Sequence, residues 1–403
     1  MQKVAAQLPL VDYQNQVVEY SLTLKKAENT IYGALSDVSK SKTLRLPTLS
    51  LSGSYSYNMR KIEGQKQWNF GVQPQLTQTI YGGGGVSAEI DSYKLKHEVA
   101  ICDINFTYLE VIYAANYAYW NLVATRRYKN AMREYVETIK SLKSVIDRRF
   151  NEGYISKSDV LMMATRLSEA EYSMVAAEQS YAVALHNFNT LRGVASGEIA
   201  EPIRADTVSF AYPKRVPLSR ILEQRPDYIA TQLTSEIYKT SIRSTKATYN
   251  PSLKAGVGVD WYPYTPNYTG KTRVDGSAFL QLSATLFHFG ERQKALSSAR
   301  ASYANSQLDE AILYDAIEKE EANGWITIID THAQLLSISK SLDIASENLE
   351  ISTYSYGEGQ TTILEVMQAQ LSWIQIYTNA INAEFNYLVA VSSYNKIVAE
   401  MEP

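Results

Sequence analysis

Two stretches of this sequence lack helix-breaking residues over a length that no compact domain can hold. Residues 86–150 contain no glycine or proline, and residues 291–356 contain only Gly324. A helix of about 60 residues rises about 1.5 Å per residue and is therefore roughly 90 Å long. A rod of this length must be stabilised by a neighbour along its side. The sequence therefore predicts long helices that pack lengthwise against other helices.

The stretches that follow these rods carry an apolar seam of the kind that lengthwise packing needs. Apolar residues recur there in steps of three and four. The first series is Val160, Met163, Leu167, Ala170, Met174, Ala177, Tyr181, Ala184, Phe188 and Leu191. The second series is Val366, Ala369, Trp373, Ile376, Ala380, Ala383, Tyr387, Ala390, Tyr394 and Ile397. A seven-residue repeat sustained over about four heptads is typical of a coiled coil.

The second half of the chain repeats the first half. LPTLSLSG at residues 46–53 matches NPSLKAGV at residues 250–257, and the segments around the two expected helix turns also align. In that second alignment the matched pairs are Phe150 with Tyr356, Glu152 with Glu358, Gly153 with Gly359, Asp159 with Glu365, and Val160 with Val366. Repetition of this kind indicates duplication.

We therefore expect two structural repeats, residues 1–205 and 206–403, each built as helix, strand, strand, very long helix, turn and long helix. The expected bounds in the first repeat are strands 48–58 and 68–81 and helices 11–44, 86–150 and 156–192. Those in the second repeat are strands 252–262 and 277–289 and helices 218–249, 291–356 and 362–400.

The four expected strands are amphipathic. In TLSLSGSYSY, residues 48–57, apolar residues alternate with threonine and serines, so one face is apolar and the other polar. Strands of about ten residues suit a tilted crossing of a membrane, whereas no run of about 18 apolar residues predicts a transmembrane helix. Four strands do not close a spanning barrel, and open edges are not tolerated in lipid. Membrane strands of this chain would therefore require an oligomer that shares one barrel.

The order of short motifs along the chain resembles the TolC-like outer-membrane efflux proteins, the outer membrane factors. The motifs are AYWNL at residues 118–122, RPD at 225–227, the strand entries PTL and PSL, the strand exits TIYGG and LFHFG, and the turns FNEG and YGEG. The resemblance covers nearly the whole chain. It implies a mainly α-helical fold with a membrane β-barrel, in a homotrimer whose twelve-stranded barrel continues into a periplasmic α-helical barrel.

By the same resemblance the protein is expected in the outer membrane of a Gram-negative (diderm) bacterium. It would be a passive exit duct of a tripartite efflux or type I secretion system, with no catalytic residue, cofactor or metal. The implied partners are a periplasmic adaptor (membrane fusion) protein, an inner-membrane RND or ABC-type pump, and outer-membrane lipid, with no nucleic acid.

The alternative is a soluble, elongated coiled-coil adaptor or scaffold of the periplasm, whose strands would form a small lipoyl-like or sandwich domain. Outward Leu, Val and Trp on all four strands, opposite faces of Ser, Gln and Thr, favour the duct.

Three groups of residues follow as candidate sites. The predicted lipid-facing residues are Leu49, Leu51, Tyr55, Tyr57, Phe70, Val72, Leu76, Val257, Val259, Trp261, Leu280 and Leu282. The tips implied to dock the adaptor are Asn151, Glu152, Gly153, Ser156, Gly357, Glu358, Gly359 and Thr362. The candidates implied for a periplasmic constriction are Glu365, Asp159, Gln368, Thr361 and Tyr356.

The constriction departs from the family pattern in two places. Thr361 stands where an arginine is common and Gln368 where a second acid is, which predicts closure by hydrogen bonds. A structural interpretation competes with this role, because Ser156-x-x-Asp159 and Thr362-x-x-Glu365 both have the spacing of a capping box. Glu365 is therefore either only a cap or part of a charged ring around a threefold axis.

Two further motifs receive structural interpretations. YGGGGVSA at residues 81–88 fits the glycine fingerprint of a dinucleotide site, but an alternating strand and a very long helix favour a flexible strand-to-helix transition. Aromatic residues at the strand ends predict an interfacial girdle, with ordinary packing in a soluble sheet as the alternative. They are Tyr55, Tyr57, Trp68, Trp261, Tyr262 and Tyr264.

Several classes of function find no support in the composition. The four histidines have no metal spacing, and His288 is expected on the polar face of its strand. The histidines are His97, His186, His288 and His332. The single cysteine, Cys102, excludes an internal disulfide framework. A net charge of −3 gives no reason to expect binding of nucleic acid, which normally needs a clustered basic face.

Overall fold

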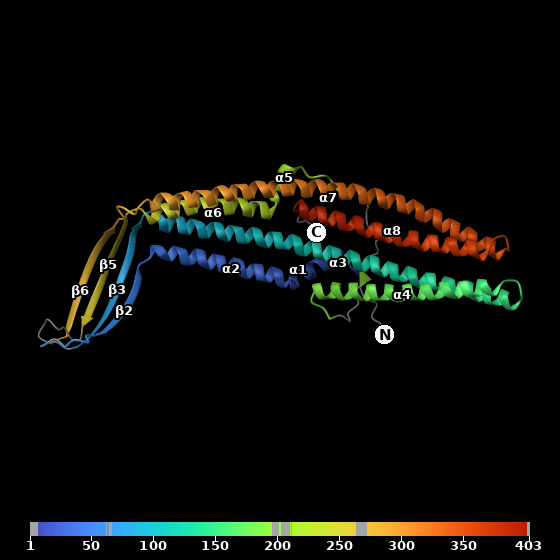
Figure 1. Cartoon of the computed structure of the whole chain (residues 1–403), viewed down its shortest axis with the longest axis horizontal. Helices are drawn as coiled ribbons and strands as arrows, with labels where there is room; N and C mark the ends of the chain where they lie inside the picture. The colour runs from blue at the N-terminus through green and yellow to red at the C-terminus, as the bar shows by residue number, and fades with distance from the viewer. Residues whose placement is uncertain are drawn as a thin grey trace. The chain divides into compact units, whose positions relative to one another are not determined.

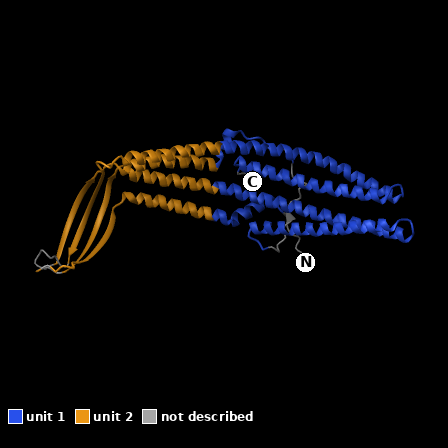
Figure 2. Cartoon of the chain, in the orientation of Figure 1, with its two compact units in different colours: residues 1–25, 105–225, 315–403 blue, residues 26–104, 226–314 orange. Residues whose placement is uncertain are grey.

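The computed structural model describes residues 7–61, 63, 67–195, 201–202, 210, 212–262 and 272–400 (Figure 1). The chain divides into two compact units (Figure 2). Unit 1 contains residues 1–25, 105–225 and 315–403, and unit 2 contains residues 26–104 and 226–314. Both units take segments from both halves of the chain, so they do not coincide with the two expected repeats, which stay a prediction. No helix in the described part of the chain has the length and apolar content needed to cross a membrane.

Helices build almost all of unit 1. They are α1 (Leu10–Tyr20), most of α3 (Gly85–Asn151), α4 (Lys157–Leu191), α5 (Leu218–Gln224), much of α7 (Glu291–Gly357) and α8 (Ile363–Ile397). Two short strands, β1 (Gln7–Leu8) and β4 (Glu201–Pro202), pair in parallel. In Figure 1, α4 runs beside α3 and α8 runs beside α7.

The apolar seams lie where the heptad pattern predicts. No position of either series is exposed, and Ala177, Phe188 and Val366 are completely buried. A hydrophobic core of unit 1 joins α3, α4, α7 and α8 through residues such as Ile139 and Met163. Many seam positions are alanine, so the helices approach closely. The predicted coiled-coil packing is confirmed.

A second core lies where α1 meets α3 and α4. The ring of Tyr13 stacks on Phe188 with 3.9 Å between centroids, and Tyr119 packs against both. The Tyr13 hydroxyl donates to the backbone carbonyl of Phe188 at 3.0 Å, which satisfies a polar group in a buried place. Burial raises the pKa of this phenol. Tyr13 therefore fastens the first helix by both apolar and polar contacts.

Unit 2 carries the four-stranded sheet. Its strands are β2 (Thr48–Tyr57), β3 (Trp68–Gly82), β5 (Ser252–Tyr262) and β6 (Arg273–Ser283). They lie in the order β2-β3-β5-β6 and all pairs are antiparallel (Figure 1). The unit also contains helix α6 (Pro226–Thr248), nearly all of α2 (Leu22–Lys42) and a 3-10 turn at Thr43–Arg45. The N-terminal parts of α3 and α7 complete it.

Two helices that the sequence predicts as continuous are broken. The expected helix 11–44 is α1 and α2, because Ser21 leaves the helical conformation and its hydroxyl accepts from the Leu24 amide at 3.3 Å, as an N-cap does. The expected helix 218–249 is α5 and α6. Arg225 is extended there because it precedes Pro226, whose ring disfavours a helical residue before it.

The expected strand 277–289 is also wrong in its bounds. β6 starts earlier, at Arg273, and ends at Ser283, which pairs with Ser252, the first residue of β5. Residues 284–288 therefore extend past the end of their neighbour. Ala284, Leu286 and His288 consequently lie in an irregular segment, not on a strand.

Candidate functional site

One face of the sheet is apolar across all four strands and exposed. The register aligns Leu49 with Leu76, Leu76 with Val257, and Val257 with Ala278. Leu51 on the edge strand is 74% exposed. The same register places all predicted lipid-facing residues on this face: Leu49, Leu51, Tyr55, Tyr57, Phe70, Val72, Leu76, Val257, Val259, Trp261, Leu280 and Leu282. Their contact with lipid stays a prediction.

The opposite face of the sheet is polar. Ser52 pairs with Gln73, and its hydroxyl donates to the Gln73 backbone carbonyl at 3.3 Å. The Gln73 side chain donates to the Tyr262 hydroxyl. Asp260 lies opposite Asp275, whose carboxylate forms an ion pair with Arg273. An exposed apolar face that extends over four strands is typical of a surface that contacts a membrane or another protein.

The aromatic residues predicted to form an interfacial girdle do not all lie on one face of the sheet, and the girdle itself stays a prediction. Tyr57 pairs with Trp68 at one end of the β2–β3 hairpin, and both lie on the apolar face. Tyr262 is an error in that prediction, because it alternates onto the polar face, where it covers Gly71 and its hydroxyl accepts from Gln73 Nε2 at 2.9 Å. Tyr264 lies outside the described residues.

The glycine run after β3 is a strand-to-helix turn. Gly83 has φ +65° and Gly84 φ +92°, and a Cβ at Gly83 would meet the Ala247 carbonyl oxygen at 2.5 Å. The side-chain amide of Asn250 donates from Nδ2 to the Gly83 carbonyl at 2.9 Å and fixes this turn. An antiparallel sheet has no βαβ unit, so the dinucleotide interpretation is excluded.

The two helix turns of unit 1 are exposed. α3 ends at Asn151 and α7 at Gly357, and Gly153 and Gly359 have the positive φ of a helix C-terminus. The residues predicted as docking tips lie in these turns and are exposed: Asn151, Glu152, Gly153, Ser156, Gly357, Glu358, Gly359 and Thr362. Docking stays a prediction.

Only one of the two expected capping boxes forms. The Ser156 hydroxyl accepts from the Asp159 amide at 3.3 Å, and the Ser156 amide donates to the Asp159 carboxylate at 3.1 Å. Thr362 occupies the N-cap position of α8 but makes no side-chain cap. Its hydroxyl donates to the Glu365 carboxylate at 3.3 Å. The Thr361 hydroxyl donates to the same carboxylate. The longer Glu365 side chain folds back onto these hydroxyls, so it does not reach the backbone amide.

The constriction candidates are held by different neighbours. Tyr356 is buried in the core between the helix pairs, and the guanidinium of Arg149 lies 4.5 Å from its ring centroid. The carboxylate of Asp159 accepts from Ser156, and the buried hydroxyl of Tyr356 has no hydrogen-bond partner, so no hydrogen bond joins Tyr356 to Asp159. The Thr361 hydroxyl donates to the Glu365 carboxylate within one chain. Closure of the constriction by hydrogen bonds stays a prediction. Sequence reasoning missed Arg149, because its partner lies 207 residues away.

Gln368 lines a groove of about 310 Å³ between α4 and α8. Arg166 lies in the same groove and pairs with Glu169 at 2.9 Å. No short motif contains Arg166, so sequence reasoning missed it.

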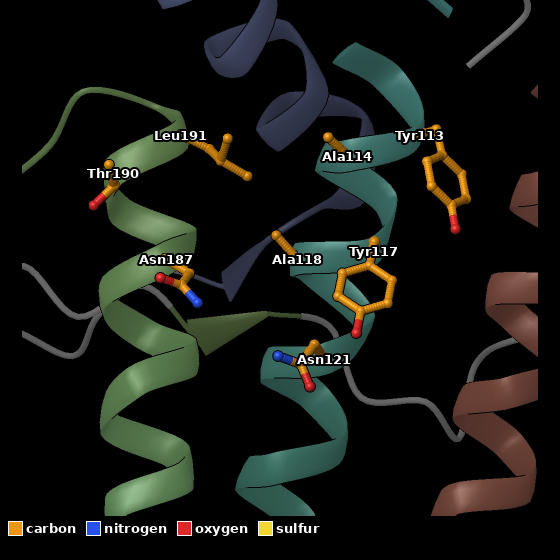
Figure 3. A pocket seen from close by; sticks show the side chains of 8 residues that line it. All are labelled: Tyr113, Ala114, Tyr117, Ala118, Asn121, Asn187, Thr190 and Leu191. Atoms are coloured by element: carbon orange, nitrogen blue, oxygen red, sulfur yellow. The ribbon is translucent and has the colours of Figure 1, made fainter. Parts of the chain in front are cut away.

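A larger cavity, of about 510 Å³, opens between α3 and α4 (Figure 3). Tyr113, Tyr117 and Asn121 contribute from α3, and Asn187 and Thr190 contribute from α4. The Tyr117 ring also meets Phe385 edge to face at 5.6 Å. Its lining is mostly apolar with a few amides, and no motif in the sequence predicts it.

The segment that links the two halves of the chain is fastened to α7. Arg215 forms two hydrogen bonds with Glu321, at 2.9 and 2.8 Å, and the Val216 amide donates to the Tyr394 hydroxyl at 3.1 Å. The hydrogen bonds from Arg215 lower the pKa of Glu321, whose carboxylate is almost fully buried. Glu321 is therefore ionised at neutral pH and holds the linker in place.

The described geometry agrees with comparisons to known proteins. A family model described as outer membrane efflux protein matches residues 13–194 and 218–393. The chain belongs to the outer membrane efflux protein family. Nodulation protein T of Rhizobium leguminosarum bv. trifolii is 23% identical over 390 residues, covering 90% of this chain and 79% of that protein. Outer membrane protein TolC of Vibrio cholerae serotype O1 is 20% identical over 411 residues, covering 97% of this chain and 91% of that protein.

Solved structures share the fold of this family member. The structure of CusC superposes with a TM-score of 0.85 at 14% identity, covering 98% of this chain and 92% of that one. The open-state MtrE channel of Neisseria gonorrhoeae gives 0.82 at 15% identity, covering 98% and 90%. The predicted TolC-like fold is confirmed. Membership of the outer membrane efflux protein family contradicts the alternative of a periplasmic adaptor or scaffold.

Proposed function

We propose that three copies of this chain form an outer-membrane exit duct. The single observation that carries the proposal is the exposed apolar face of an antiparallel sheet, in a chain that belongs to the efflux family. Three sheets of four strands close one twelve-stranded barrel, in which the apolar face meets lipid and the serine and glutamine face lines a wet lumen.

Exposed apolar stripes on the helices of unit 1 support the same assembly. Tyr172 and Val175 on α4 are 79% and 64% exposed. On α7, Ile344 and Ile351 are 68% and 57% exposed. Stripes of this kind on long helices are covered when neighbouring copies pack lengthwise, as the seams within the chain already do.

The duct is passive, and an adaptor and an energised inner-membrane pump dock at the turns of unit 1. The exposed tips around Gly153 and Gly359 are the docking surface of this proposal. A channel that supplies no energy itself needs such partners to move cargo outward. Solved structures with the same fold support a channel, since they include the outer-membrane channel OprN and a study of transmembrane channel formation by CusC.

Reconstitution tests the duct directly. The purified protein, added to a planar lipid bilayer, should produce discrete single-channel ion currents, and its detergent-corrected mass should equal three chains. A protein that stays soluble without detergent, runs as a monomer and never conducts would contradict the proposal. Crosslinking in the native cell, followed by mass spectrometry, identifies the adaptor and the pump.

Glu365 is proposed as part of the periplasmic constriction. Because its carboxylate is not a helix cap but accepts from Thr361 and Thr362, the cap-only interpretation loses its support. Three copies around one axis would form a ring of negative charge that favours cations. Glu365→Gln should therefore lower the cation-to-anion permeability ratio in single-channel recordings, while helix content and trimer stability are unchanged.

Glu347→Gln is the matched control for this change. It removes the same charge from an exposed position on α7, away from the turn, and should leave the permeability ratio at the parent value. If Glu365→Gln also conducts with the parent ratio, the constriction role is wrong.

A further inference from the structure

The two outer edges of the sheet in unit 2 match each other in hydrogen-bond phase. The Asn58 amide donates to the Gln67 carbonyl at 2.6 Å, and bonded positions alternate along an antiparallel pair. The even-numbered residues of β2, in phase with Asn58, therefore direct their peptide groups toward β3. The odd-numbered residues, which include Leu49 and Leu51, direct theirs away from β3. The same alternation, carried through the register of β3 and β5, directs the peptide groups of Leu280 and Leu282 away from β5.

These outward peptide groups belong to residues of the apolar face on both edges. If β6 of one copy pairs antiparallel with β2 of the next and the apolar faces stay on one side, the outward groups of both strands meet. An offset of one residue would break both conditions at once. Only every second register is therefore allowed.

Barrel geometry reduces the allowed registers to two. Within one chain the path perpendicular to the strands runs from Leu49 to Ala278. If Ala278 pairs with Gly53 of the next copy, the register shifts by about four residues over the four strands of one chain. If Ala278 pairs with Tyr55, the register shifts by about six residues. With about 3.3 Å per residue and about 4.8 Å between strands, the strands tilt by about 35° or about 46° from the barrel axis, at the two ends of the range for barrels. The right-handed twist of strands fixes the direction of this shift.

The segment after β6 decides between the two registers. Alternation continues in the sequence through Ala284 and Leu286, although the strand ends at Ser283 for lack of a neighbour. Leu286 is 96% exposed. In the six-residue register Ala284 lies opposite Leu49 of the next copy, so the alternating residues after Ser283 gain a strand to pair with. In the four-residue register Leu49 faces Leu282, and this segment stays unpaired.

We propose that residues 284–286 become a strand on β2 of a neighbouring copy, in the register that places Ser52 opposite Gln281 and Thr48 opposite Thr285. The inference rests on the proposed shared barrel and adds to it the interface residues and their alignment. The edge is thus incomplete in one chain, and the second copy completes it.

Cysteine pairs test this register in the native outer membrane, in a Cys102→Ser background. Ser52→Cys with Gln281→Cys occupies a pair without mutual hydrogen bonds, where Cα atoms lie about 4.5 Å apart, a distance that disulfides accept. Ser50→Cys with Gln281→Cys is the matched control, displaced by two residues, or about 7 Å. After oxidation, non-reducing gels should show a ladder up to three chain masses for the first pair and monomers for the second.

Each other outcome overturns a defined part of the inference. A ladder from the control pair alone means that the register is wrong while the shared barrel holds. With neither pair linked, a native mass of three chains means that β6 does not pair with β2, and a native mass of one chain contradicts the proposed duct as well. Thr48→Cys with Thr285→Cys should also give the ladder; if it does not while the first pair does, residues 284–286 do not become a strand.

Discussion

Leu51→Arg should nearly abolish the amount of assembled protein in the outer membrane. Leu51 lies on the apolar face of the edge strand β2, opposite Pro74, and is exposed in the single chain. A cation on the lipid face near the bilayer midplane costs about 2 to 4 kcal/mol, which corresponds to a roughly 30- to 1,000-fold loss in the equilibrium for insertion. The trimer band in membrane fractions, quantified on semi-native gels, measures it. Val257→Arg, on the central strand β5, should behave in the same way.

Ser52→Arg is the matched control, because Ser52 is the next residue of the same strand and lies on the polar face. The same side chain there enters the wet lumen and should leave the trimer band within about twofold of the parent. Equal tolerance of arginine on both faces would show that the apolar face does not meet lipid.

Phe188→Ala should lower the thermal stability of the helical part strongly. Phe188 is completely buried, stacks on Tyr13 and occupies a position of the first heptad seam. Removing a buried phenylalanine ring costs about 3 to 5 kcal/mol, or roughly 6 to 20 °C in the unfolding midpoint of a unit of this size. Circular dichroism at 222 nm during heating, in detergent, measures the shift.

Gln179→Ala, on an exposed position of the same helix, is the control and should melt with the parent. Unchanged melting of Phe188→Ala would mean that the contact of α1 with α4 contributes little to stability. In that case the order of α1 would depend on neighbouring copies.

The long helices and the seams could be predicted because their causes are local and repeated. Absence of Gly and Pro over residues 86–150 permits one continuous helix, and the heptad pattern defines which side is buried. The strand faces could be predicted for the same reason, since period-two alternation directs Leu49 and Ser50 to opposite sides whatever their neighbours are.

The errors fall where a distant partner decides the local conformation. Alternation continues past Ser283, but a strand needs a neighbour, and β5 begins opposite that residue. Tyr262 is an exception, because alternation after Trp261 already places it on the polar face, and the register adds only that it lies over Gly71. Thr362 and Glu365 have the spacing of a capping box, yet a glutamate one methylene longer than Asp159 bonds hydroxyls instead.

The sequence by itself determined the duplication, the rods, the seams and the two chemically opposite faces of each strand, because these depend on residue type and spacing along the chain. The tertiary structure alone decided which strand lies at which edge, and that Arg149 covers the ring of Tyr356. It also decided that Glu365 is held by Thr361 instead of an arginine. Contacts between residues more than 200 positions apart, such as Arg149 and Tyr356, depend on how rods and strands align side by side. That alignment is set by the combined packing of many side chains, so no short segment encodes it.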